Sequence, residues 1–161
     1  MSNAVTPTPV PFKERFFEDY PVGEIAEFGD YPVTEAEILA FSAQYDPQAF
    51  HLDQTAGAGS IYGGLIASGW MTASVAMRMM VDHYISPRSS MGSPGIDELR
   101  WLRPVRPGDR LRLRVSVMDA RASQSKPDRG LVQFLEEVLN QEGETVMSLK
   151  GFGMYARRPT A

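Results

Sequence analysis

The side chains best suited to acid–base chemistry are those of Asp46 and His51, which stand five positions apart. A histidine titrates close to neutral pH, and a carboxylate beside an imidazole gives a pair that can move protons. Pro47 disfavours helix at the residue before it, so we expect an irregular segment between the two. The apolar neighbour Phe50 draws this segment toward the core. The structural alternative is that Asp46 caps a turn and that His51 is a hydrogen-bonded core histidine.

The composition leaves few other groups for catalysis. The chain has 161 residues, no cysteine and only two histidines, His51 and His83. Disulfides, thiolate metal sites and cysteine nucleophiles are therefore excluded, and two histidines cannot complete a three-histidine zinc site. His83 falls near the end of a predicted helix, where a cation is favoured, so we interpret it as structural. We expect one domain over residues 13–158 after a flexible tail over residues 1–12, with no metal and no cofactor.

Charge and hydropathy narrow the class of partner. Sixteen basic and twenty acidic residues give a net charge of −4, and no stretch is basic enough to follow phosphates, so we expect no nucleic acid partner. The mostly apolar residues 65–81 are fewer than the ~20 of a membrane span and include Arg78. They predict a buried helix. The first residues lack the charged start and apolar run of a signal peptide, so we expect a cytoplasmic protein that does not bind membranes.

A second candidate for chemistry is formed by Ser68, Gly69 and Trp70, in the first turns of that helix. Backbone N–H groups at a helix start are unpaired, and a glycine lets a ligand oxygen come close to its N–H. Such a site suits the negative oxygen that develops on a thioester during reaction. The alternative is that Gly69 serves the packing of helix against sheet.

The elements around these residues indicate the class α+β. Thr34 and Glu37 have the spacing of a capping box and predict a helix that continues to about Tyr45. Residues 46–64 are expected to be mostly irregular, with one helical turn after Asp53, and a long helix of about 30 Å is expected to follow them. One or two short strands with a turn near Gly29 are expected within residues 25–33. Further strands are expected at residues 96–102, 110–117, 131–139 and 145–155. Short connections between the last strands predict an antiparallel sheet.

Several stretches together resemble the MaoC-like dehydratase family of hotdog proteins, which includes (R)-specific enoyl-CoA hydratases. The family's hydratase motif runs Asp-x-Asn-Pro-aliphatic-His, and residues 46–51 keep its acid and its histidine at the same spacing. The family's oxyanion glycine opens the long helix eighteen residues after the histidine, where this chain has Gly69. Residues 17–23 and 102–109 resemble the family's opening and the strand and turn before its long β ribbon.

This chain departs from the family pattern at three positions. Gln48 and Ala49 stand where the motif has Asn and Pro, and Met77 stands where some members place a serine near the catalytic pair. Ser68 or Ser74 is the alternative source of such a hydroxyl.

The resemblance implies a hotdog fold of class α+β, in which a curved antiparallel sheet wraps one long helix. It implies hydration of a trans-2-enoyl-CoA, or the reverse dehydration, with Asp46 and His51 as catalytic residues and the Gly69 N–H on the thioester oxygen. It also implies an acyl-CoA substrate and a homodimer or a dimer of dimers. A hotdog thioesterase and a non-catalytic acyl-CoA-binding protein are the alternatives. Residues expected beside the substrate are Ser68, Phe50 and Trp70, and those expected on the CoA phosphates are Arg100, Arg103 and Arg106.

Overall fold

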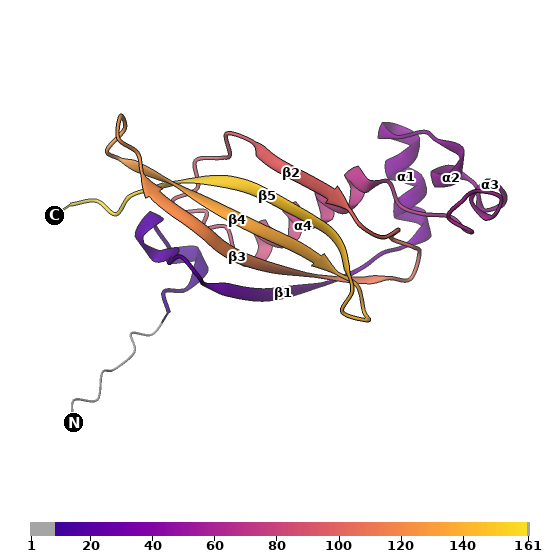
Figure 1. Ribbon diagram of the computed structural model, residues 1–161, viewed down its shortest axis with the longest axis horizontal. Helices are drawn as coiled ribbons and strands as arrows, with labels where there is room; N and C mark the ends of the chain where they lie inside the picture. The colour runs from indigo at the N-terminus through magenta and orange to yellow at the C-terminus, as the bar shows by residue number, and fades with distance from the viewer. Residues whose placement is uncertain (1–8, 161) are drawn as a thin grey trace, which may run out of the picture.

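The computed structural model describes residues 9–160. One antiparallel sheet of five strands, in the order β1-β3-β4-β5-β2, runs alongside helix α4 (Figure 1). The strands are β1 (Ile25–Pro32), β2 (Ile96–Trp101), β3 (Arg110–Ala122), β4 (Arg129–Leu139) and β5 (Thr145–Ala156). The helices are α1 (Glu35–Tyr45), α2 (Ala49–Leu52), α3 (Gln54–Ala58) and α4 (Gly69–His83), preceded by the 3-10 turns η1 (Phe12–Glu14) and η2 (Phe17–Asp19). The class α+β and the antiparallel sheet predicted from the sequence are confirmed.

Helix α4 begins later than the apolar pattern predicts. The sequence predicts that the helix starts at Leu65, four residues before its actual start at Gly69. It has 15 residues, a length of about 22 Å. The residues just before it are not helical, because their backbone groups bond elsewhere, as where the Ile66 N–H donates to the Phe50 carbonyl at 3.3 Å. Ser68 then caps the helix, because its hydroxyl accepts a hydrogen bond from the Trp70 N–H at 3.3 Å.

One side of α4 packs on the sheet, and the opposite side is exposed. Met71, Val75 and Met79 are buried, whereas Trp70 and Val81 are 58% and 54% exposed. The sheet of a single chain therefore leaves an apolar outer face on this helix. Within residues 9–160, no helix is both long enough and apolar enough to cross a membrane.

The segment between α1 and α4 is more helical than the sequence pattern predicts. Helix α1 is capped as expected, because the Thr34 hydroxyl accepts a hydrogen bond from the Glu37 N–H at 3.2 Å. Helix α3 is the helical turn expected after Asp53, whose carboxylate accepts a backbone N–H at 2.7 Å. Helix α2 was not expected. Pro47 restricts its own backbone and that of the residue before it, so it does not prevent a helix from starting at Ala49.

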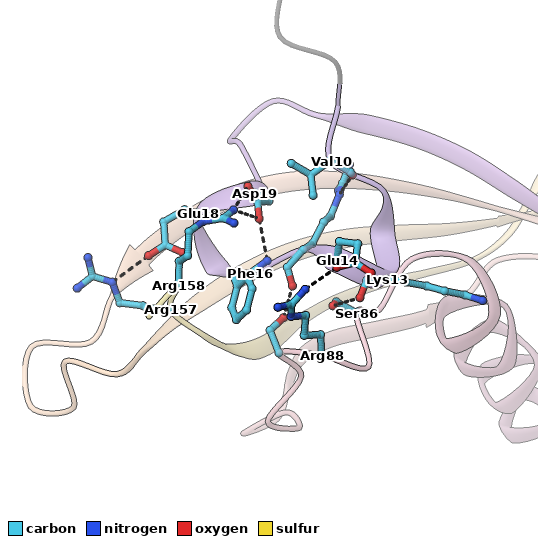
Figure 2. Close-up of polar contacts among 12 residues, drawn as sticks. Val10, Lys13, Glu14, Phe16, Glu18, Asp19, Ser86, Arg88, Arg157 and Arg158 are labelled. Carbon is cyan, nitrogen blue, oxygen red and sulfur yellow. Dashed lines mark hydrogen bonds and ion pairs between the residues drawn. The ribbon is translucent and has the colours of Figure 1, made fainter. Parts of the chain in front are cut away.

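The N-terminal turns are tied to the last residues of the chain. Figure 2 shows Glu18 in an ion pair with Arg157 at 3.2 Å and Asp19 in an ion pair with Arg158 at 2.6 Å. The turn η1 begins within the predicted tail, whose first eight residues lie outside the described part of the chain. In Figure 1 this junction lies at the opposite end of the sheet from α1, α2 and α3.

One acidic residue lies inside the core. Glu136 is on the inward face of β4, the middle strand of the sheet, and is only 7% exposed. Burial raises the pKa of Glu136 to about 7, because a carboxylate loses its hydration there. Between its ordinary pKa and this value, the folded chain holds a proton that the unfolded chain has released. Above about pH 7, the folded chain carries a buried charge.

We expect Glu136→Gln to stabilise the protein increasingly as the pH rises. Because the folded pKa is raised, the contribution of Glu136 to stability falls from its ordinary pKa up to about pH 7. An amide does not ionise, so the advantage of the variant should grow by about 2 kcal/mol between pH 5 and pH 8. Urea unfolding at pH 5 and at pH 8 measures the difference in the free energy of unfolding between the variant and the wild-type protein. Glu137→Gln, on the other face of the same strand, is the control, and a pH-independent difference for Glu136→Gln would contradict the prediction.

Candidate active site

The chain brings Asp46 and His51 into contact at the junction of two helices. Asp46 directly follows α1, and His51 lies on α2, so one short turn of chain connects them. His51 Nε2 is 3.2 Å from Asp46 Oδ2. The histidine is 5% exposed, which keeps the pair at the edge of the core rather than in bulk solvent. The predicted acid–base pair is therefore present as a contact.

The orientation of His51 is fixed by a backbone carbonyl. His51 Nδ1 lies 2.8 Å from the carbonyl oxygen of Ile66. A carbonyl only accepts hydrogen bonds, so Nδ1 carries the proton and donates it. In the neutral ring, the lone pair then lies on Nε2, on the side of Asp46. A ring held this way has the free nitrogen that a general base requires.

Two side chains hold the carboxylate of Asp46. The Ser68 hydroxyl donates to Oδ2 at 2.7 Å, and the Gln48 amide donates to Oδ1 at 2.7 Å. The hydrogen bond from the Ser68 hydroxyl has the largest effect in holding the pKa of Asp46 below its ordinary value, and the bond from the Gln48 amide has the next largest. Asp46 is therefore ionised at neutral pH. Gln48, which departs from the family motif, supplies one of these two contacts.

The start of α4 lies beside this pair. Ser68 is fully buried and links the helix cap to Asp46, because its hydroxyl accepts from the Trp70 N–H and donates to the carboxylate. Among residues 9–160, no hydrogen-bond partner is found for the Gly69 N–H. This N–H is one of the unpaired donors expected at a helix start.

Gly69 is closely covered by an aromatic ring. A Cβ added at Gly69 would lie 2.4 Å from Cε2 of the Trp101 indole, which is shorter than any normal contact. Trp101 comes from the end of β2 and meets the ring of Trp70 edge-on, at a centroid distance of 5.1 Å. Both interpretations of Gly69 therefore have a structural basis, because the glycine opens the helix and also makes room for Trp101.

A cavity of about 500 Å³ adjoins the pair and the helix start. This size is within the ordinary range of small-molecule sites. Of the residues predicted to contact substrate, Phe50 and Trp70 line the cavity, whereas Ser68 lies behind Asp46. The full lining consists of Asp46, Gln48, Phe50, His51, Tyr62, Ile66, Ala67, Gly69, Trp70, Thr72, Trp101, Leu102, Arg103, Pro104, Val105 and Val146.

The three arginines predicted for CoA differ in their surroundings. Arg103 lines the cavity and forms an exposed ion pair with Glu144 at 3.4 Å. Arg100 is 3.8 Å from Glu98 and does not line the cavity. Arg106 donates a hydrogen bond to the carbonyl of Tyr62 and is likewise outside the lining.

The structure also distinguishes between Ser68 and Ser74, the two alternative hydroxyl donors. Ser74 bonds to the Trp70 carbonyl at 2.8 Å on the exposed side of α4, away from the acid–base pair. Ser68 reaches Asp46. Met77, at the position where some family members have a serine, is half exposed and is not part of this cavity.

Sequence reasoning missed several residues of the cavity, above all Trp101, Tyr62 and Thr72. Trp101 stands at the end of an edge strand, and no local spacing connects it with Gly69. Tyr62 follows a glycine-rich segment that had no predicted contact. Thr72 follows Gly69 by nearly one helical turn, so helical periodicity alone could have placed it near the cavity.

A five-stranded antiparallel sheet along one long helix, with an acid–base pair at the helix start, is the hotdog architecture predicted from the sequence. Residues 19–137 match the family described as MaoC like domain. The chain therefore belongs to the MaoC-like dehydratase family. A MaoC-like dehydratase from Rhodospirillum rubrum has 39% sequence identity and a TM-score of 0.85, with 91% of this chain and 99% of that chain covered.

Two further proteins are similar to the chain. The R-hydratase PhaJ1 from Pseudomonas aeruginosa shares the fold, with a TM-score of 0.72, 24% identity and coverage of 89% of this chain and 86% of that chain. A mesaconyl-CoA hydratase from Cereibacter sphaeroides is 30% identical over 155 residues. That alignment covers 91% of this chain but 43% of the larger enzyme.

Proposed function

We propose that the protein hydrates trans-2-enoyl-CoA thioesters, or dehydrates 3-hydroxyacyl-CoA in the reverse direction. The observation that carries the proposal is the oriented pair, with His51 Nε2 at 3.2 Å from Asp46 Oδ2, beside a cavity that includes the start of α4. A pair of this kind can hold and deprotonate one water molecule. The name of the mesaconyl-CoA hydratase relative supports a CoA thioester as the substrate class.

The proposed reaction uses each group once. Asp46 Oδ2 and His51 Nε2 hold a water molecule, and His51 takes one of its protons while the water oxygen bonds to the β-carbon. The π electrons of the double bond move toward the α-carbon and the thioester oxygen. The Gly69 N–H stabilises that oxygen, helped by the positive end of the helix dipole. The proton then passes from His51 to the α-carbon, which restores the base.

For the CoA part, we propose Arg103 as the contact for a phosphate. It is the only one of the three predicted arginines that lines the cavity, and its side chain is more than half exposed. Its partner Glu144 is also exposed, and exposed ion pairs are weak enough to exchange for a phosphate. We place this activity in the acyl-CoA chemistry of the cytoplasm.

Incubation with crotonyl-CoA tests the proposal. We expect the absorbance of the enoyl thioester to fall without release of free thiol. Thiol release would instead identify a thioesterase, and binding without turnover would identify a non-catalytic acyl-CoA-binding protein. Either result would overturn the proposal.

We further propose that two chains associate through β2 and the outer face of α4. β2 is an edge of the sheet, and an open edge is a site for pairing with another chain. Beside it lie exposed apolar side chains on both elements, which a monomer would leave in water. They are Trp70, Met77, Val81, Ile96 and Trp101.

A homodimer is accordingly the expected result of light scattering at micromolar concentration. Val81→Arg places a charge in the apolar face and should shift the protein to the monomer, while circular dichroism remains native. Ile61 is 94% exposed and lies outside this face, so Ile61→Arg is the matched control and should leave the dimer intact. A wild-type monomer at this concentration would refute the proposed association.

A further inference from the structure

A second cavity lies further along α4, between the helix and the sheet, and it opens toward the exposed apolar face described above, because the half-exposed Met77 lines it. Its volume is about 360 Å³. Ala73, Met77 and Met80 of α4 form one wall, and Leu149 of β5 contributes to the opposite wall. Most of this lining is apolar. Its polar side chains are Glu136 on β4, whose carboxyl group lines the cavity, together with Ser90, Ser93 and Tyr155.

Glu136 has no partner within residues 9–160. It is 7% exposed, yet no hydrogen bond or ion pair to its side chain is found there. Among the residues that line the cavity, Tyr155 is the only other titratable group, and none is a cation. A carboxyl group buried without a partner is costly, and a hydrogen-bonding group that enters the cavity would satisfy it. The packing of the core does not require an acid here, since an apolar side chain fills such a position at lower cost.

The two cavities follow one another along the same elements. Thr72 lines the first and Ala73 the second. On the sheet, Glu136 pairs with Leu149, which pairs with Leu99 of β2, two residues before Trp101. Glu136 is therefore roughly 7 Å along the strands and roughly 10 Å across them from the tryptophan that covers Gly69. An acyl chain of about eight carbons, with its carbonyl at Gly69, spans this separation once the reach of the glutamate side chain is included.

We propose that this second cavity receives the acyl chain of the substrate and that Glu136 binds a hydroxyl or similar hydrogen-bond donor at the far end of that chain. The inference rests on the proposed function and specifies its substrate class as medium-chain enoyl-CoA with a polar terminus. A plain alkyl end would leave the carboxyl group without a partner, whereas a hydroxyl would satisfy it. A site with a buried polar group discriminates strongly against an analogue that lacks the matching group.

The test compares trans-2-octenoyl-CoA with its ω-hydroxylated derivative. In the wild-type protein, we expect kcat/KM to be about 10–100-fold higher for the hydroxylated substrate, as a hydrogen bond to an otherwise unpartnered carboxyl group predicts. Glu136→Leu should reverse this preference. Glu136→Gln retains an acceptor oxygen and should keep the preference in reduced form. Glu137→Leu, on the opposite face of the strand, should preserve the wild-type ratio.

The outcomes separate this inference from the proposed function. Failure of the wild-type protein to hydrate crotonyl-CoA and both octenoyl substrates would overturn both. Hydration of crotonyl-CoA with equal kcat/KM for the two octenoyl substrates would overturn the role of Glu136 alone. So would a preference that survives in a folded Glu136→Leu protein.

Discussion

Replacing His51 with alanine is expected to lower the rate of enoyl-CoA hydration by roughly 10²–10⁴-fold, the usual contribution of a general acid–base group. His51 Nε2 is the nitrogen left free to accept a proton, because Nδ1 donates to the Ile66 carbonyl at 2.8 Å. Asp46→Asn should produce a loss of the same order, since the amide removes the negative charge that holds the water and the imidazolium. Initial rates on crotonyl-CoA, with the folded fraction checked by circular dichroism, measure both effects.

The second histidine provides the matched control for this experiment. His83 lies at the end of α4, where its ring packs against Phe28 at a centroid distance of 5.7 Å, and it has no contact with the cavity. His83→Gln should therefore retain wild-type turnover. The alanine at position 51 also removes one hydrogen bond, which costs about 1 kcal/mol and leaves the protein folded. Wild-type turnover in a folded His51→Ala protein would remove His51 from the mechanism.

A valine in place of Gly69 is expected to reduce turnover by about 3 kcal/mol of transition-state free energy, the effect of losing one oxyanion donor. The backbone N–H of this position survives the substitution, but the side chain crowds the approach of the thioester oxygen. The structure adds a second effect, because the new Cβ would lie 2.4 Å from the indole of Trp101. Overpacking of this kind costs ~1–3 kcal/mol of stability. CoA itself should still bind.

A double variant separates these two effects. Trp101→Ala removes the ring that the introduced valine side chain would strike, so Gly69→Val combined with Trp101→Ala should regain the melting temperature of Trp101→Ala alone. If the N–H binds the thioester oxygen, turnover in the double variant stays low. Recovery of turnover to the level of Trp101→Ala would make Gly69 a packing residue, and the proposed mechanism would lose its electrophile.

The parts of the site that could be predicted from sequence are those set by neighbouring residues. Asp46 and His51 are joined by a short segment, so their contact depends on little else. The predicted start of α4 was too early, because no local signal in the apolar run before Ser68 separates that run from the helix. Its backbone groups bond to distant residues instead, as in the bond from the Ile66 N–H to Phe50.

Glu136 and Trp101 illustrate what sequence could not reveal. Both faces of β4 carry apolar side chains, because Leu131 and Leu135 alternate with Val132 and Phe134, so alternation does not indicate which face is inward. A glutamate in such a strand would ordinarily be assigned to the solvent side. The contact of Trp101 with Gly69 joins residues 32 positions apart and depends on the position of β2 at the sheet edge. Only the assembled sheet establishes either feature.

The bond from His51 Nδ1 to the Ile66 carbonyl has a stereochemical consequence. It prevents the ring from turning to present its other nitrogen, so in the proposed reaction the proton accepted at Nε2 can leave only from Nε2. Asp46, which holds the water, lies on that same side. Oxygen and hydrogen are then delivered to one face of the planar double bond, so the addition is syn. In deuterated water, each enoyl-CoA would give a product with a single relative configuration at the α- and β-carbons.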